Sequence, residues 1–276
     1  MSSAAELSLG VIGLGRMAQA LLQPLLESGE LSRPQLQACV ASAASAQQLS
    51  DRFEISVGLD PRPALGAKFV LLAIKPQQLD ALLHQLAPLG PPAPQANGDA
   101  PLLISVLAGV RLERLQASFP GWRVVRAVPN TPALVRQGLV GLAYGGDVSP
   151  SQRQQVQRWF GLVGEVFELP ESQLDGFLAL TSSGPAFAAL VVEALADGAV
   201  AAGLPRALAT PLAQKMLSGS MALLEQQGLH PGELKDMVSS PAGTTIAGLR
   251  VLEQAGLRSA LIEAVLTASE RSRALG

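Results

Sequence analysis

Short, uninterrupted runs of apolar residues recur through the first part of the chain, with turn residues and helix-forming segments between them. A run of this length is typical of a strand buried on both faces of a parallel sheet. The clearest run, residues 69–74, is entirely apolar and ends abruptly at Lys75 and Pro76. The pattern predicts strands at residues 9–12, 36–41, 69–74, 102–106, 123–128, 139–144 and 163–169.

The pattern changes near Glu171, because no convincing strand follows it. Long segments rich in alanine and leucine predict helices at residues 185–202, 205–227, 244–255 and 257–274. The sequence therefore predicts an α/β domain over residues 1–170 and an all-helical domain over residues 171–276. The long helices are apolar and lack charge patterning, so we expect them to bury a surface against a second copy of the chain.

Residues 185–202 are nearly as apolar as a membrane span. Glu193 and Asp197 lie inside this segment with Gly198 and several alanines, and they argue against insertion into a bilayer. We therefore expect no membrane partner.

Composition favours a globular protein with a sizeable core, since 48% of the 276 residues are hydrophobic and 15% are charged. The net charge of −2, without a long run of either sign, indicates no nucleic-acid or membrane surface. Cys39 is the only cysteine, and His84 and His230 are the only histidines. This excludes an intramolecular disulfide and argues against a transition-metal site. No signal peptide is recognisable, so we expect a cytoplasmic protein.

The first predicted strand leads into a glycine-rich turn. Residues 7–22 read LSLGVIGLGRMAQALL, in which Gly13, Gly15 and Ala18 form a G-x-G-x-x-A pattern between strand and helix. In Rossmann-type dinucleotide-binding folds, the first glycine permits the tight turn and the second lets the backbone approach a pyrophosphate. The alanine lets the helix pack on the strand, and the helix N-terminus offers free N–H groups to the phosphates.

The turn after the second predicted strand favours NADP(H), although NAD(H) stays possible. A carboxylate near this point usually binds the ribose hydroxyls of NAD, but no acidic residue lies between Glu30 and Asp51. Ser42 and Ser45 can donate hydrogen bonds to a 2′-phosphate, and Arg16 can supply positive charge. Alternatively, the two serines only cap the following helix.

A second group of small polar residues precedes a predicted helix in the C-terminal part. Residues 239–245 read SSPAGTT. Hydroxyls and free N–H groups at a helix N-terminus can bind a small carboxylate. An ordinary Ser/Thr N-cap explains the same residues and remains the alternative.

Nearly the whole chain resembles the Δ1-pyrroline-5-carboxylate reductase family. The matching segments are IGLGRMAQALL, LLAIKPQQL, LISVLAGV, VVRAVPNTPALV, TSSGPAFAALVVEAL and ELKDMVSSPAGTTIAGLRVLE. The last is the most specific, because its Ser-Ser-Pro and Gly-Thr-Thr pattern is not a general feature of dinucleotide folds. The resemblance implies reduction of a cyclic imine to L-proline with NAD(P)H, the last step of proline biosynthesis. It also implies a homodimer, with higher assembly of dimers common in the family.

The resemblance implies a substrate site shared between the dinucleotide domain of one subunit and the helices of its partner. Ser240, Gly243, Thr244 and Thr245 would bind the substrate, and the catalytic residue Thr245 would hydrogen-bond the ring nitrogen and assist its protonation. The residues implied to bind the cofactor are Gly13, Leu14, Gly15, Arg16, Met17 and Ala18 at the pyrophosphate, Ser42 and Ser45 at the adenosine 2′-position, and Ala73, Ile74, Lys75, Pro76, Val106, Leu107, Ala108, Pro129, Asn130 and Thr131 on the nicotinamide side.

Several positions depart from the family pattern. Ala43 and Ala44 occupy a turn where members often carry an arginine. Ser182 and Phe187 alter the usual Gly-Ser-Gly-Pro-Ala-Tyr, and Ala242 stands where a second glycine is usual. We expect these changes to tune the activity and not to abolish it.

Two other functions remain open from the residues alone. A β-hydroxyacid-type dehydrogenase has the same domain layout, but it needs a lysine base on a C-terminal helix. Lys215 and Lys235 are the candidates, and Lys235 beside Asp236 is more simply explained by a surface ion pair. A non-catalytic NADPH-binding sensor would bind the nucleotide without turning over an imine.

Overall fold

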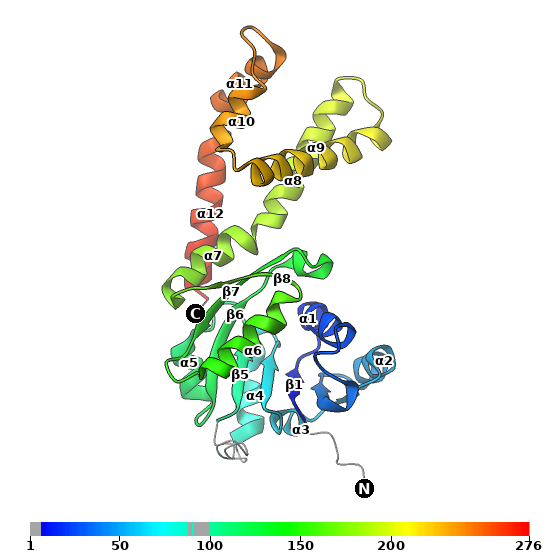
Figure 1. Ribbon diagram of the computed structural model, residues 1–276, viewed down its shortest axis with the longest axis vertical. Helices are drawn as coiled ribbons and strands as arrows, with labels where there is room; N and C mark the ends of the chain where they lie inside the picture. The colour runs from blue at the N-terminus through cyan, green and yellow to red at the C-terminus, as the bar shows by residue number, and fades with distance from the viewer. Residues whose placement is uncertain (1–6, 88–89, 91–99, 276) are drawn as a thin grey trace. The chain divides into compact units, whose positions relative to one another are not determined.

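The computed structural model describes residues 7–87, 90 and 100–275, and the chain divides into two compact units (Figure 1). Unit 1 holds the chain up to Ser182 together with the segment from Ser269 onward, and unit 2 holds residues 183–268. The domain limits drawn from the sequence, 1–170 and 171–276, remain a prediction.

Unit 1 is built on one sheet whose described strands lie in the order β3-β2-β1-β4-β5-β6-β7-β8. Neighbouring strands are parallel except for the antiparallel pair β6 and β7. Each predicted strand is found; four are shorter than predicted by one or two residues, and the strand predicted at residues 139–144 is longer by one. The bounds are β1 Leu9–Ile12, β2 Leu36–Cys39, β3 Ser56–Gly58, β4 Phe69–Leu72, β5 Leu102–Ser105, β6 Arg123–Val128, β7 Gly138–Tyr144 and β8 Gly164–Glu168.

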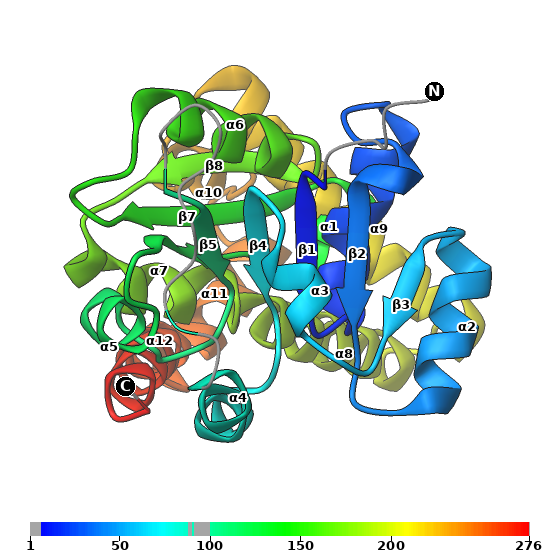
Figure 2. The same cartoon turned by 90° about the horizontal axis from the view of Figure 1, so that it is seen from below.

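Helices cover both faces of this sheet, and the strands bury alternate residues against each face (Figure 2). In β4, Leu71 packs with α1, α2 and α6, whereas Val70 and Leu72 pack with α3, α4 and α5. Burial on both faces explains why these strands appear as continuous apolar runs. The helices and 3-10 turns of unit 1 are α1 Arg16–Glu27, η1 Arg33–Gln35, α2 Ala43–Phe53, α3 Arg62–Leu65, η2 Pro76–Gln78, α4 Leu79–Leu86, α5 Leu112–Ser118, η4 Thr131–Val135, α6 Pro150–Gly161, η5 Glu171–Gln173 and α7 Leu174–Thr181.

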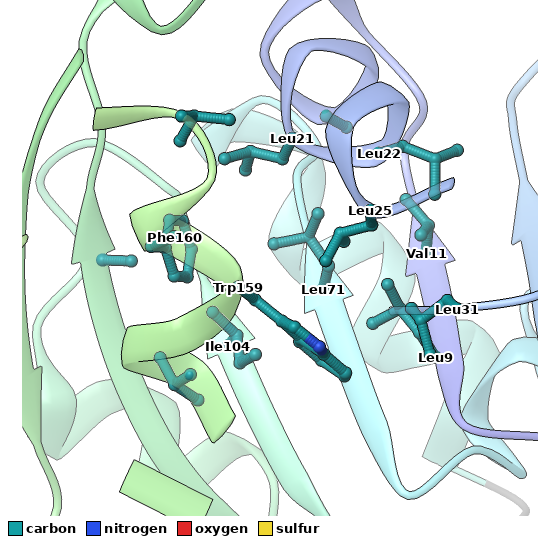
Figure 3. Packing of buried hydrophobic residues seen from close by; sticks show 14 of the residues in the cluster. Leu9, Val11, Leu21, Leu22, Leu25, Leu31, Leu71, Ile104, Trp159 and Phe160 are labelled. Carbon is teal, nitrogen blue, oxygen red and sulfur yellow. The ribbon is translucent and has the colours of Figure 1, made fainter. Parts of the chain in front are cut away.

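The core on the first face is centred on Trp159 and Phe160 of α6, which pack near Leu21 and Leu25 of α1 (Figure 3). The Trp159 ring meets that of Phe69 edge-on, with centroids 4.8 Å apart. This packing fixes α1, and with it the glycine-rich turn, on the sheet.

Short α3 approaches β1 closely over the other face. A Cβ atom at Gly10 would lie 2.7 Å from the carbonyl carbon of Ala64, so only glycine fits there. Neither α3 nor β3 was predicted, because each is short and has no apolar run of its own.

Unit 2 is all-helical in its described residues and contains α8 Gly184–Ala201, α9 Arg206–Gln227, α10 Pro231–Met237, α11 Thr244–Gln254 and most of α12 Leu257–Arg273. Helices α8 and α9 pack through Ala196, Ala209 and Ala213. The long predicted helices are confirmed to within a residue or two at each end.

Candidate functional site

A cavity of about 730 Å³ opens where β1, β2 and β4 end. These three strands lie side by side in the sheet (Figure 2). Ligands of open α/β sheets bind at the carboxyl ends of strands, so this is the expected place for a ligand. The residues lining it are Ile12, Gly13, Leu14, Gly15, Gln19, Cys39, Val40, Ala41, Ser45, Gln48, Leu49, Arg52, Leu59, Pro61, Ala73, Ile74, Lys75, Gln78, Ala81, Leu82 and Gln85.

The two glycines of the turn are required for different reasons. Gly13 has φ of +91°, and a Cβ atom there would lie 2.8 Å from the carbonyl carbon of Ala73. Gly15 has φ of −75°, and a Cβ atom there would meet nothing within 4 Å. Gly13 therefore shapes the turn, as predicted, while Gly15 leaves open space beside the backbone. Ala18 is a buried residue of α1 itself, as the close packing of this helix on the strand requires.

The N-terminus of α1 is free to receive an anion. Gly15 is its N-cap, no side chain caps it, and no acidic residue lies in its first turn. Within this turn Arg16 is exposed, Met17 is half-buried and Leu14 is buried. Uncapped N–H groups and the positive end of the helix dipole favour a phosphate at this point.

The charges around the cavity are positive. Among its described lining residues are Arg52 and Lys75 but no aspartate or glutamate. Nearby Asp60 is paired with Arg62, whose Nη2 lies 2.6 Å from Oδ2. Hydrogen bonds from the Arg62 side chain and backbone lower the pKa of Asp60, so the carboxylate stays ionised and neutralised by its partner. The cavity therefore suits a polyanion.

Cys39 lies at the end of β2 and lines the same cavity. Burial raises the pKa of its thiol to about 11, so it is a neutral, small apolar group near pH 7.

The serines after β2 have different positions. Ser42 is the N-cap of α2, with the backbone N–H of Ser45 donating to its Oγ at 3.3 Å. The Ser42 hydroxyl in turn donates to the Ser45 hydroxyl at 2.9 Å. Ser42 therefore caps α2, and Ser45 alone of the two lines the cavity. A contact of either serine with the cofactor stays a prediction. Arg16 lines a separate hollow of about 390 Å³, which Gln19 and Arg52 also border.

The residues predicted on the nicotinamide side fall into two groups. Ala73, Ile74 and Lys75 line the cavity, with Pro76 next to them at the start of η2. Val106, Leu107 and Ala108 follow β5, and Pro129, Asn130 and Thr131 follow β6; none of these is part of the cavity lining. Their part in cofactor binding stays a prediction.

Both polar atoms of the Asn130 side chain form hydrogen bonds with the protein backbone. Asn130 is 4% exposed; its Nδ2 donates to the Thr181 carbonyl at 2.9 Å, and its Oδ1 accepts from the Leu139 N–H at 2.8 Å. Ser182 donates to the Pro129 carbonyl at 3.3 Å, so the hydroxyl that departs from the family pattern supports this same loop.

The SSPAGTT segment begins α11 in unit 2. Gly243 is the N-cap, and no side chain caps this helix, so the ordinary Ser/Thr cap is wrong for this position. The Gly243 N–H donates to the Ser240 carbonyl at 3.1 Å. Thr244 is exposed, and Thr245 is half-buried. Ala242 has φ of +56°, a left-handed conformation that costs a non-glycine residue about 1–2 kcal/mol.

Sequence reasoning missed several lining residues on α2. Gln48, Leu49 and Arg52 follow Ser45 at intervals of three, four and seven residues and share one helix face. That spacing was visible in the sequence, but the face of α2 that meets the cavity was not.

Among the lysine candidates for a dehydrogenase base, Lys235 is confirmed in an ion pair with Asp236 at 3.1 Å. The described residues contain no group of three or more metal-ligating side chains.

The largely parallel sheet, the uncapped glycine-rich turn and a cavity whose described lining contains no carboxylate define an NAD(P)-binding protein with a helical second unit. Residues 8–109 match a family model described as NADP oxidoreductase coenzyme F420-dependent, and residues 171–275 match one described as pyrroline-5-carboxylate reductase dimerisation. The chain belongs to the pyrroline-5-carboxylate reductase family.

Relatives from distant organisms support this membership. The chain is 42% identical to a pyrroline-5-carboxylate reductase of Synechocystis sp., covering 98% of this chain and 99% of the relative. It is 35% identical to that of Escherichia coli, covering 98% of each. A solved Plasmodium falciparum pyrroline carboxylate reductase with NADP bound has a TM-score of 0.85 and 25% identity, covering 99% of this chain and all of that one.

Membership of this family explains why one helical segment has an apolar surface that a single copy of the chain leaves exposed. Glu171–Ala201 is long and apolar enough to cross a membrane, and only 11% of its most apolar window is buried. It lies within the residues that match the dimerisation model, so a second subunit covers its apolar surface. The chain therefore forms a homodimer.

Proposed function

We propose that this chain reduces Δ1-pyrroline-5-carboxylate to L-proline with NADPH as the hydride donor. The observation that carries the proposal is full-length similarity to reductases of that name, at 42% identity, in a chain with a polyanion-binding cavity.

NADP(H) is the preferred cofactor in this proposal, and NAD(H) is a poorer one. No described lining residue is a carboxylate that would repel a 2′-phosphate, and Ser45 places a hydroxyl in the cavity. The NADP bound to the Plasmodium falciparum relative agrees with this preference.

The substrate carboxylate binds at the start of α11. The Ser240 hydroxyl and the Thr244 N–H are the donors, because no side chain of the protein caps this helix. The Gly243 N–H donates to the Ser240 carbonyl, so Gly243 contributes by shaping the turn at the carboxylate. Thr245 is half-buried in the first turn of the same helix, where its Oγ1 hydrogen-bonds the ring nitrogen.

When bound, NADPH would supply a hydride from C4 of its nicotinamide ring to the imine carbon. The electron pair of the C=N bond would then remain on the imine nitrogen, which is protonated in the iminium form. Thr245 orients this nitrogen and assists its protonation. The protein otherwise holds the two reacting carbons together and excludes water, which can lower the barrier by several kcal/mol.

The assembly completes the proposal. Each substrate site is shared between the dinucleotide domain of one subunit and the helices of its partner. Domains 1–170 and 171–276 divide these roles, dimers associate further, and the enzyme acts in the cytoplasm.

The direct test follows absorbance at 340 nm with purified protein, pyrroline-5-carboxylate, and NADPH or NADH in parallel. We expect oxidation that depends on the imine and is faster with NADPH at equal concentrations. Nucleotide binding without oxidation by any imine would favour the sensor, and turnover of a hydroxy acid alone would favour the dehydrogenase.

The role of Thr245 is tested by Thr245→Ala, with Thr267→Ala of α12 as the matched control. Loss of a proton-assisting hydroxyl should lower kcat/KM about 100-fold, while the control keeps the wild-type value. Full kcat/KM in Thr245→Ala would show that the hydroxyl takes no part.

A further inference from the structure

Arg52, in the last turn of α2, lines the cavity without a carboxylate partner. Its Nη1 donates to Oε1 of Gln19 at 2.8 Å, and its guanidinium carbon lies 5.0 Å from the centre of the Phe53 ring. The described part of the chain provides no ion pair for this guanidinium. Both contacts orient the group, and neither neutralises its charge.

Gln19 connects Arg52 to the glycine-rich turn. Its Nε2 donates to the Leu14 carbonyl at 2.9 Å, while its Oε1 accepts from Arg52. A single amide therefore fixes the guanidinium relative to the turn expected to bind the pyrophosphate.

One face of α2 carries both Arg52 and a residue close to the end of β2. Ser45, Gln48, Leu49 and Arg52 share this face and line the cavity. Arg52 therefore borders the same cavity as Ser45, which follows β2 by six residues.

Arg52 also lies on the side of the cavity where the 2′-phosphate of the cofactor is expected. The sheet order β2-β1-β4 places Lys75, which follows β4, on the opposite side of β1 from β2. Residues 41–46 after β2 carry no charge. In this fold the ribose 2′-position lies near the end of β2. Among the described residues that line this cavity, Arg52 is therefore the cation on the β2 side, where it could pair with a phosphate at that position.

We propose that Arg52 recognises the 2′-phosphate of NADP(H) and sets the preference of this chain for that cofactor over NAD(H). The inference rests on the proposed NADPH-dependent function and adds the residue that decides it. A planar guanidinium presents paired N–H donors that match two phosphate oxygens, whereas an amide or hydroxyl has no charge to offer.

The test measures binding by calorimetry, without turnover, on the full-length protein. The probes are 2′,5′-ADP and 5′-AMP, which differ only in the 2′-phosphate. The variants are Arg52→Gln, Arg52→Lys and the control Arg33→Gln, whose arginine pairs with Glu54 at 2.9 Å and is absent from the cavity lining.

We expect the wild type to bind 2′,5′-ADP more tightly than 5′-AMP. Arg52→Gln should reduce that affinity ratio about tenfold, as loss of one charge-assisted contact implies, and leave 5′-AMP binding unchanged. Arg52→Lys should keep part of the ratio, and Arg33→Gln all of it. Unchanged 5′-AMP binding also shows that the variant is folded.

An unchanged ratio in Arg52→Gln, or an equal loss in Arg33→Gln, would overturn the inference. So would a wild-type protein without preference for 2′,5′-ADP. If the preference is present but no imine is reduced, only the proposed reaction fails, and the assignment of Arg52 stands.

Discussion

Single residues decide how closely a nucleotide can approach the sheet. Gly13 lies against Ala73, the first residue after β4, and its N–H donates to the Cys39 carbonyl at 2.9 Å. It therefore joins the ends of three strands. Gly15 has no such neighbour and faces open space. One glycine is required by the protein itself, and the other by what binds to it.

This difference predicts separable effects of two identical substitutions. Gly13→Ala should destabilise the fold by about 2 kcal/mol, because the methyl group meets backbone and φ is positive. Gly15→Ala should change stability by no more than about 1 kcal/mol, the usual cost at an N-cap. Both should weaken NADPH binding at least tenfold. Urea unfolding and fluorescence titration measure the two quantities; equal stability losses would contradict this account.

At the scale of elements, a buried ionic cluster ties the end of the chain to the sheet. Arg126 of β6 is 1% exposed; its guanidinium lies 3.1 Å from Glu171 and 3.6 Å from Asp175 of α7. The Ser272 hydroxyl of α12 donates to Asp175 at 2.7 Å. Leu275 packs on Gly109, next to the loop of residues 106–108. The last residues of the chain thus support a loop expected at the nicotinamide.

Asp175→Asn tests this cluster against an exposed ion pair. Loss of a buried charge beside Arg126 should cost about 2–3 kcal/mol of unfolding free energy. The same change at Asp80, which pairs with Arg114 at 2.9 Å on the surface, should cost less than about 1 kcal/mol. Hydrogen exchange of residues 269–275 should also accelerate in Asp175→Asn alone. Similar losses of unfolding free energy in both variants would show that the buried cluster stabilises the fold no more than an exposed ion pair.

At the scale of the whole molecule, the helical unit is incomplete as a single copy. Large apolar side chains on α8, α9, α11 and α12 are exposed, among them Leu190, Met216, Val251 and Ile262. A stable soluble monomer rarely leaves so many together. Because this region matches the dimerisation model, its folding and its association are parts of one equilibrium.

Leu190→Asp tests the dependence on the partner. Leu190 is 64% exposed in a single copy, and a carboxylate there should be costly once a second subunit covers it. Sedimentation should show a dimer dissociation constant raised at least tenfold, corresponding to about 1.4 kcal/mol. Ser151→Asp on α6, outside the matched region, adds the same charge and should leave association unchanged. A wild-type protein that sediments as a monomer at micromolar concentration would refute this account.

Much of the architecture followed from local pattern. The buried strands were predictable because burial on both faces demands an unbroken apolar run, as in β4. The turn at Gly13 was predictable because positive φ and close approach restrict a position to glycine. The long helices were predictable because their alanine- and leucine-rich segments extend over several turns. The start of α11 was predictable because Ser, Thr and Gly are common at helix N-termini.

Other features depended on residues distant in the sequence. Short β3 and α3 exist because β2 and β1 offer a strand edge and a glycine at which they can pack. The Asn130 side chain hydrogen-bonds to Thr181 and Leu139. Arg126 pairs with a residue 45 positions further along the chain, Glu171. Arg52 lies in the last turn of α2, and it borders the cavity only because the fold places α1 and α2 beside it.

The sequence by itself determined the long helices, the buried strands, the dinucleotide turn and the family, since each depends on neighbouring residues along the chain. Only the tertiary structure decided which side chains share the cavity and which charges are neutralised. Those properties depend on distances across the sheet, and local pattern does not encode them.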